Sequence, residues 1–232
     1  MKKNVLYTML FAMVALLVTS CGDKTSEGKS RFTYYPTIEL EGDSYLVWDK
    51  GTPWVEPGYS SVLNGDDVTS EVTISGSVDT STSGIYNLTY TTKKNDDGFD
   101  ASTSRTVVVL DPNSDIEGFY LTQPDSYRSY NGNDVAYGRA FEILVIDNGD
   151  GTLDVDDLFG GWYCQRAGYG TNYCCIGTIA LDGSDVSLVG SYVPGWGDEL
   201  VGLTGTYADG VFEIEAEYVS GMKFFQTWVK EQ

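Results

Sequence analysis

The chain has 232 residues, with 34 Asp and Glu against 14 Lys and Arg, no histidine and a formal net charge of −20. Nucleic acid is therefore excluded as a partner, because binding it needs cations clustered on one face, and an anionic membrane surface would repel the folded part. Without histidine the chain cannot carry Ser-His-Asp or Cys-His catalysis or most catalytic zinc sites, so any chemistry would rest on carboxylates, tyrosines or cysteines.

The first twenty residues have the pattern of an export signal. Lys2 and Lys3 precede a mostly apolar run over residues 5–18, which is short for a membrane span. Small residues then stand just before Cys21, an ending that resembles the lipobox of bacterial lipoproteins. The resemblance implies cleavage before Cys21, lipid on this cysteine and durable anchoring to a membrane. We expect this membrane to be the outer membrane, with the protein at the cell surface. The alternative is an uncleaved N-terminal helix, which Ser20 and Cys21 would end in an unusual way.

The remainder of the chain is predicted to be all-β and to form two domains. Short runs rich in Val, Ile, Thr and Tyr are broken by Gly, Asn, Asp and Ser about every 8 to 12 residues. A polar break with a proline, at residues 111–115, separates the two halves. We therefore predict a signal peptide (1–20), a lipidated cysteine with a flexible tether (21–35), an Ig-like domain (36–111) and a β-barrel-like domain (112–232).

The first half predicts an immunoglobulin-like β-sandwich without a core disulfide. Strands are expected at residues 37–41, 45–47, 58–62, 72–74, 84–92 and 105–110. The half also resembles a bacterial Ig-like domain first named from a pesticidal crystal protein. The resemblance lies in EPGY (56–59), DVT (67–69), GSVDT (76–80), GIYNLTY (84–90) and RTVVVLD (105–111). It implies a spacer or stalk module with no conserved active site.

The second half predicts an antiparallel, lipocalin-like barrel or a curled sheet. Strands are expected at residues 118–121, 140–146, 152–157, 162–166, 175–181, 185–193, 201–207, 211–218 and 222–229. Together with the Ig-like domain, IEGFY (116–120) and DLFGGWY (157–163) resemble a two-domain lipoprotein family of gut Bacteroidota. That family is often encoded beside glycan-uptake systems. The resemblance implies a glycan and outer-membrane uptake proteins as partners.

One acidic segment, IDNGDGTLDVDD (146–157), has the composition of a calcium loop. Asn148, Asp150, Asp154 and Asp157 occupy the third, fifth, ninth and twelfth positions of an EF-hand loop that has Gly151 at its sixth. Ile146 would be the first ligand and has no oxygen to offer. The preceding segment is also a predicted strand, so a hairpin turn is favoured over calcium, and no metal or cofactor is expected.

Three cysteines remain besides Cys21, namely Cys164, Cys174 and Cys175. A zinc site would need a fourth soft or imidazole ligand, which the sequence lacks. On a strand, Cys174 and Cys175 would point to opposite faces, so at most one of them faces Cys164. We expect one disulfide that closes the loop 165–173, and one buried free thiol.

A set of aromatic residues in glycine-rich segments suggests a ligand site. Flat aromatic faces stack on sugar rings, while neighbouring polar side chains bond the hydroxyls. The alternative is that these rings fill the barrel core. The candidate ligand-binding residues are Trp162, Tyr163, Gln165, Arg166, Tyr169, Tyr173, Tyr192 and Trp196.

The function predicted from these features is a non-catalytic, lipid-anchored surface protein that binds carbohydrate alongside a glycan-uptake system. The alternative is a structural or adhesion lipoprotein that makes protein–protein contacts in the envelope. Acidic residues are so abundant that any two could be paired as glycosidase carboxylates, so this signal carries no weight.

Overall fold

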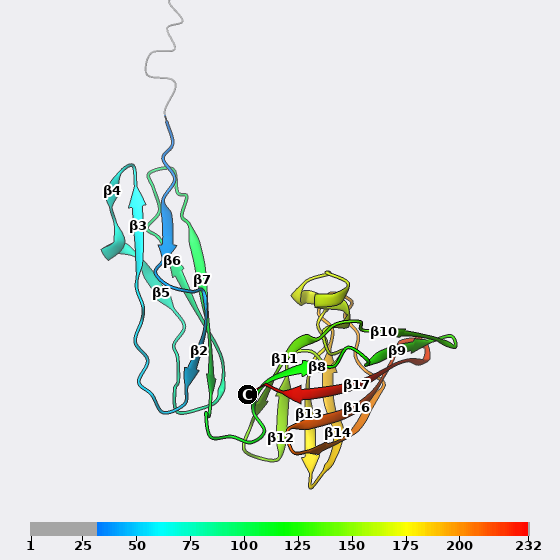
Figure 1. Cartoon of the computed structure of the whole chain (residues 1–232). Coiled ribbons are helices and arrows are strands. Elements are labelled where there is room, and N and C mark those ends of the chain that lie inside the picture. The colour runs from blue at the N-terminus through cyan, green and yellow to red at the C-terminus, as the bar shows by residue number, and fades with distance from the viewer. Residues whose placement is uncertain (1–31, 232) are drawn as a thin grey trace, which may run out of the picture.

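The computed structural model describes residues 32–231, which form an N-terminal β-sandwich beside a C-terminal β-barrel (Figure 1). The predicted signal peptide, Cys21 and most of the predicted tether lie outside the described residues. Within 32–231, no helix is long and apolar enough to cross a membrane. The all-β prediction is confirmed for both domains.

The N-terminal domain packs a three-stranded sheet against a four-stranded one, as expected for an Ig-like sandwich. In the second sheet, β2 runs parallel to β7, and the remaining pairs are antiparallel. The first sheet has the order β1 (Thr37–Leu40), β3 (Tyr59–Leu63), β4 (Asp66–Asp67); the second has β2 (Tyr45–Asp49), β7 (Ser102–Leu110), β6 (Gly84–Thr91), β5 (Thr73–Ser75). A short 3₁₀ turn, η1 (Thr69–Glu71), follows β4.

A buried arginine takes the place of the missing disulfide between these sheets. Arg105 projects from β7, and its side chain is fully buried. Its guanidinium donates hydrogen bonds to the carbonyl oxygens of Glu41, Asp43 and Gly58 and forms an ion pair with Glu56 at 3.2 Å. The EPGY (56–59) and RTVVVLD (105–111) segments therefore meet in space as one polar cross-link.

The C-terminal domain closes into an eight-stranded antiparallel barrel, which selects the barrel over the open curled sheet. Closure occurs where the last strand pairs with the first, with Trp228 opposite Thr122. The barrel strands are β8 (Gly118–Thr122), β11 (Phe141–Asp147), β12 (Thr152–Val155), β13 (Ile176–Asp182), β14 (Asp185–Tyr192), β15 (Gly202–Ala208), β16 (Val211–Tyr218) and β17 (Met222–Lys230). A 3₁₀ turn, η4 (Val219–Gly221), links the last two strands.

Large side chains fill the inside of the barrel. In β16, Phe212, Ile214 and Ala216 are buried, while the intervening glutamates face outward. Tyr120 and Trp228 lie in the same core cluster as these residues and are completely buried. The barrel is therefore a packed scaffold, unlike the ligand-holding lipocalin barrels.

Two parts of the barrel domain differ from the sequence prediction. Residues 162–166 were predicted as a strand, but they form a π-helix, η2 (Trp162–Arg166), because Gly160 and Gly161 turn the chain with φ of 58° and 84°. A hairpin of β9 (Tyr127–Tyr130) and β10 (Asn133–Ala136) was not predicted. It extends from β17 beyond the barrel wall (Figure 1).

The two domains share an apolar interface formed by two continuous hydrophobic runs. Val107 and Val109 of β7 face the sandwich core, whereas Val108 and Leu110 point outward. They cluster with Leu144 and Ile146 on the outside of β11, and Phe119 packs against the group. A strand that is buried on both faces carries consecutive apolar residues and does not alternate. This explains the unbroken apolar runs within TVVVL of β7 and FEILVI of β11.

A buried glutamate ties the same junction together. Glu117 Oε1 accepts hydrogen bonds from the Ser83 hydroxyl of the sandwich and from the Asp111 amide of the connecting segment. Its Oε2 accepts a bond from the Asp147 amide of the barrel at 3.2 Å. One carboxylate therefore joins both domains and the segment between them.

Beside the junction, Asp156 is expected to make the stability of the protein depend on pH. Its carboxylate accepts a hydrogen bond from the Leu144 amide, and burial, with a smaller contribution from the neighbouring Asp157 and Glu142, raises its pKa to about 7. Below about pH 3.9 this group is protonated in both the folded and unfolded states, so ionisation costs nothing. As the pH rises from about 3.9 to 7, Asp156 ionises in the unfolded state before it ionises in the folded state, so the free energy of unfolding falls.

We therefore expect Asp156→Asn to increase the free energy of unfolding by about 2–4 kcal/mol at pH 8, and to change it little at pH 4. The asparagine oxygen can still accept the Leu144 hydrogen bond. Urea unfolding at the two pH values measures the difference, with the exposed Asp182→Asn as control. An equal effect of Asp156→Asn at both pH values would contradict the assignment.

Candidate functional site

The candidate site is a group of aromatic rings that two loops bring together at one end of the barrel. The first loop contains η2 and η3 (Thr171–Tyr173); the second joins β14 to β15. Together they join Tyr163, Tyr169, Tyr173 and Trp196 in one connected cluster of ring contacts, and we call these four residues the aromatic platform. The helical turns of the first loop lie over this end of the barrel (Figure 1).

Trp196 is the centre of the aromatic platform. Its ring lies 4.7 Å from the Tyr163 centroid, 5.0 Å from that of Tyr173 and 6.3 Å from that of Tyr169, each in an edge-on arrangement. Tyr163 and Tyr169 are stacked, at 6.1 Å. Such offset and edge-to-face contacts are the favoured geometries for aromatic pairs, so the rings support one another.

The platform is open to solvent. Tyr169 is 56% exposed and Trp196 41% exposed, while Tyr163 and Tyr173 are half-buried. Large aromatic side chains are normally mostly buried, so two of them exposed in contact are informative. Of the two alternatives left open by the sequence, surface exposure therefore holds for Tyr169 and Trp196.

Local backbone features hold the two loops against each other. The Gly195 amide donates a hydrogen bond of 2.6 Å to the Asn172 carbonyl oxygen. A Cβ atom at Gly195 would lie 2.6 Å from the Tyr173 ring, so only glycine permits this approach. Asp198 then fixes the far end of the second loop by accepting a hydrogen bond from the Tyr218 hydroxyl at 2.6 Å.

Three of the predicted ligand residues make contacts that support η2. Trp162 is buried, and the guanidinium groups of Arg166 and Arg128 lie 4.1 and 5.0 Å from its ring centroid. Arg166 also donates hydrogen bonds to the carbonyl oxygens of Ala136 and Tyr137. Gln165 is bonded to the Glu142 carbonyl oxygen. These contacts hold η2 over the barrel, with Trp162 buried and with Gln165 and Arg166 exposed.

Tyr192, the remaining candidate, lies apart from the platform. It is 49% exposed and lies outside the ring contacts that join the four platform residues. Together with Ile85 of the sandwich and Ile176 of β13, it lines a cleft of about 580 Å³ between the two domains.

The sequence did not predict the contact of Asp198 with Tyr218 that anchors the second loop. The acidic residue directly after PGWG was the one signal for such an anchor.

The calcium candidates do not converge on one point. Asn148 and Asp150 lie in the turn of the hairpin between β11 and β12, where both bond Thr152. Asp154 accepts a hydrogen bond from the Thr178 hydroxyl across the sheet, and Asp157 is buried near η2. The predicted hairpin is confirmed, and among residues 32–231 these four carboxylate and amide groups form no metal-binding cluster.

The three cysteines are free thiols in the structure. The sulfur atoms of Cys164 and Cys174 and a carboxylate oxygen of Asp157 all lie within 4.8 Å of one another. Cys175, by contrast, belongs to the barrel core. The disulfide stays a prediction. If the disulfide forms, this arrangement favours Cys164 and Cys174 as its partners.

The structure thus belongs to the class of two-domain all-β proteins in which an Ig-like sandwich is joined to a packed eight-stranded barrel. The family model for a bacterial surface protein, Ig-like domain, matches residues 38–109, and a C-terminal-domain model of BT2262-like lipoproteins matches residues 109–230. The chain belongs to this two-domain family of Bacteroidota lipoproteins.

One solved structure supports the assignment. The crystal structure of the lipoprotein BT2262 from Bacteroides thetaiotaomicron is 37% identical, with a TM-score of 0.68, over 84% of this chain and all of that chain. The M60 catalytic domain with two CBM51 domains of ZmpB from Clostridium perfringens is 13% identical, with a TM-score of 0.29, over 85% of this chain and 21% of that one. That second likeness is too weak to carry any argument. No curated protein matches the chain, and neither matched family model is catalytic.

Proposed function

We propose that this protein is a lipid-anchored protein of the outer-membrane surface that binds carbohydrate through the aromatic platform. The observation that carries the proposal is the exposure of Tyr169 and Trp196 in one supported cluster. A sugar ring presents an apolar face of C–H groups that packs on an aromatic ring, and the ring quadrupole adds to this contact. Kinship with a Bacteroides lipoprotein supports the anchoring.

The chemistry around the platform suits a neutral glycan better than an anionic one. The chain carries a net charge of −20, and the acidic Asp198 follows Trp196 by two residues in the same loop. The Asn172 side chain is exposed beside the second loop and offers both a donor and an acceptor to sugar hydroxyls. The proposed ligand is therefore an uncharged polysaccharide, taken up by a neighbouring glycan-uptake system.

The experiment is a titration of neutral polysaccharides against the lipid-free protein from residue 22 onward, followed by affinity gels. We expect Trp196→Ala to weaken binding at least tenfold, because one stacked ring and its buried area are lost. Tyr192→Ala removes an equally exposed ring outside the platform and should bind as the parent does. Failure of the parent to bind any polysaccharide would refute the proposal.

The second candidate is a structural lipoprotein that contacts other envelope proteins. The cleft between the domains favours it, because the exposed side chains of Ile85, Ile176 and Tyr192 gather there. Loss of a protein partner from a pull-down with Tyr192→Ala, and not with Trp196→Ala, would support this function over carbohydrate binding.

A further inference from the structure

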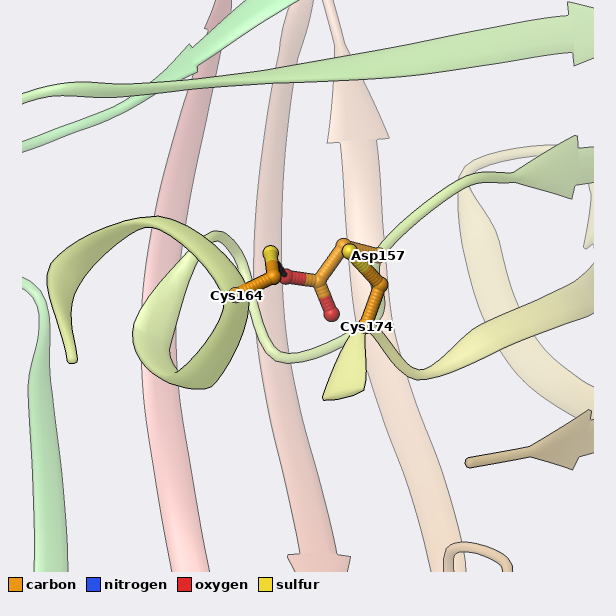
Figure 2. Close-up of side chains that lie close together, drawn as sticks. All are labelled: Asp157, Cys164 and Cys174. Atoms are coloured by element: carbon orange, nitrogen blue, oxygen red, sulfur yellow. Dashed lines mark hydrogen bonds between the residues drawn. The ribbon is translucent and has the colours of Figure 1, made fainter. Parts of the chain in front are cut away.

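Two cysteines and a buried carboxylate meet at the base of the loop that carries most of the aromatic platform. Cys164 lies in η2, Cys174 directly follows η3, and Asp157 lies between β12 and η2. Figure 2 shows the three side chains pointing toward one another, with their sulfur and carboxylate oxygen atoms all within 4.8 Å. A bond between the two sulfur atoms would close residues 165–173, with Tyr169 and Tyr173, into a ring.

Asp157 is held firmly in place beside Cys164. Its Oδ1 accepts hydrogen bonds from the amides of Phe159 and Cys175, and its Oδ2 accepts one from the Gly161 amide. Its Oδ2 also accepts a hydrogen bond from the Cys164 thiol, with sulfur and oxygen 3.0 Å apart. Burial raises the pKa of Asp157, which makes it a stronger base than an exposed aspartate.

The two thiols differ in their access to solvent. Cys164 is only 8% exposed, and its contact with Cys174, burial and the Asp157 carboxylate raise its pKa above the ordinary thiol value. Cys174 is partly exposed. A reagent from outside therefore meets Cys174 first, while Cys164 stays protonated behind it.

We propose that Cys164 and Cys174 are a thiol–disulfide exchange site, in which an external disulfide oxidises the pair and Asp157 receives the proton of Cys164. Cys174 gives its proton to water, its thiolate attacks the external disulfide to form a mixed disulfide, and the first external sulfur leaves as a thiolate that takes up that proton. Cys164 then passes its proton to Asp157 while its sulfur attacks Cys174 Sγ, and the second external sulfur leaves as a thiolate. That thiolate takes up the proton, so two electrons pass from the cysteine pair to the external disulfide.

Cys175 is excluded from this pair by the backbone. Cys174 is extended, with φ −72° and ψ 143°, so the next side chain points the other way. Cys175 is completely buried in the barrel core, where burial raises its pKa. It is the free thiol that remains, and it provides a matched control.

The test exposes the lipid-free chain to reduced and oxidised glutathione mixtures, followed by rapid alkylation and peptide mass spectrometry. We expect one disulfide, Cys164–Cys174, in the parent and in Cys175→Ala. Cys164→Ser should hold a glutathione adduct on Cys174, whereas Cys174→Ser should react at least tenfold more slowly at Cys164. Oxidation should raise Tm by about 5–10 °C, since it closes a short loop, and should slow amide exchange over residues 165–173.

Alkylation of all three thiols after full oxidation, or a disulfide that includes Cys175, would overturn the proposal. So would protection of Cys164 and Cys174 by added zinc with no disulfide formed. The covalent state is read by mass and does not depend on carbohydrate binding. The exchange site can therefore fail or hold independently of the function proposed for the platform.

Discussion

Replacing Arg105 with methionine is expected to lower the free energy of unfolding of the Ig-like sandwich by about 3–5 kcal/mol, the usual cost of removing one partner from a buried ion pair. The methionine keeps most of the packing volume but leaves the Glu56 carboxylate without its cation. It also leaves the carbonyl oxygens of Glu41, Asp43 and Gly58 without the bonds they accept from the guanidinium.

The measurement is hydrogen exchange of the β7 amides, combined with urea unfolding. The control is Lys93→Met, which removes an exposed ion pair with Glu71 and should cost no more than about 1 kcal/mol. Arg105→Lys should also destabilise, because an ammonium cannot span three carbonyl oxygens and a carboxylate as the planar fork does. A loss for Arg105→Met no larger than that for Lys93→Met would contradict the role of this residue as the link between the sheets.

The second large effect is expected for Trp162→Ala, at about 3–5 kcal/mol of unfolding free energy, because a buried tryptophan leaves a cavity that its surroundings cannot fill. The ring is packed edge-on to Tyr137 at 4.9 Å, and the guanidinium groups of Arg128 and Arg166 both lie over it. Its loss also releases two cations from the ring face, where each interaction contributes about 0.5–2 kcal/mol.

Thermal unfolding of Trp162→Ala should be compared with that of Trp196→Ala, which deletes the same side chain from the surface. The exposed variant should retain nearly the stability of the parent and lose binding. The buried variant should lose stability, and it should lose binding only as far as η2 unfolds. If Trp196→Ala were the more destabilising of the two, the aromatic platform would be part of the core.

The sequence indicated most strands because alternation and turn residues are local signals. GIYNLTYTT and VFEIEAEYV were placed to within a residue or two of β6 and β16. Residues 162–166 were misassigned because tertiary contacts hold them: Arg166 bonds carbonyl oxygens far away in the sequence, beside β10. The β9–β10 hairpin was missed since YRSYNGNDVA is polar on both faces, so it shows no hydrophobic period.

The candidate site was predictable only in part, for a related reason. Tyr163, Tyr169, Tyr173 and Trp196 were grouped correctly as aromatics in glycine-rich loops. Their composition could not distinguish them from Trp162 or Tyr192, because burial depends on how the loops lie over the barrel. The composition likewise could not show which thiol Asp157 would contact, since that depends on the path of the chain through η2 and η3.

The solid interior of the barrel has a kinetic consequence for the proposed ligand. A sugar on the aromatic platform stays in contact with water and enters no chamber, so no gate has to open before it binds or leaves. Association should therefore approach the rates of simple encounter, and individual contacts should be short-lived. Durable retention of a polysaccharide would come from several anchored copies holding successive segments of one polymer, at the effective concentration that a shared membrane provides.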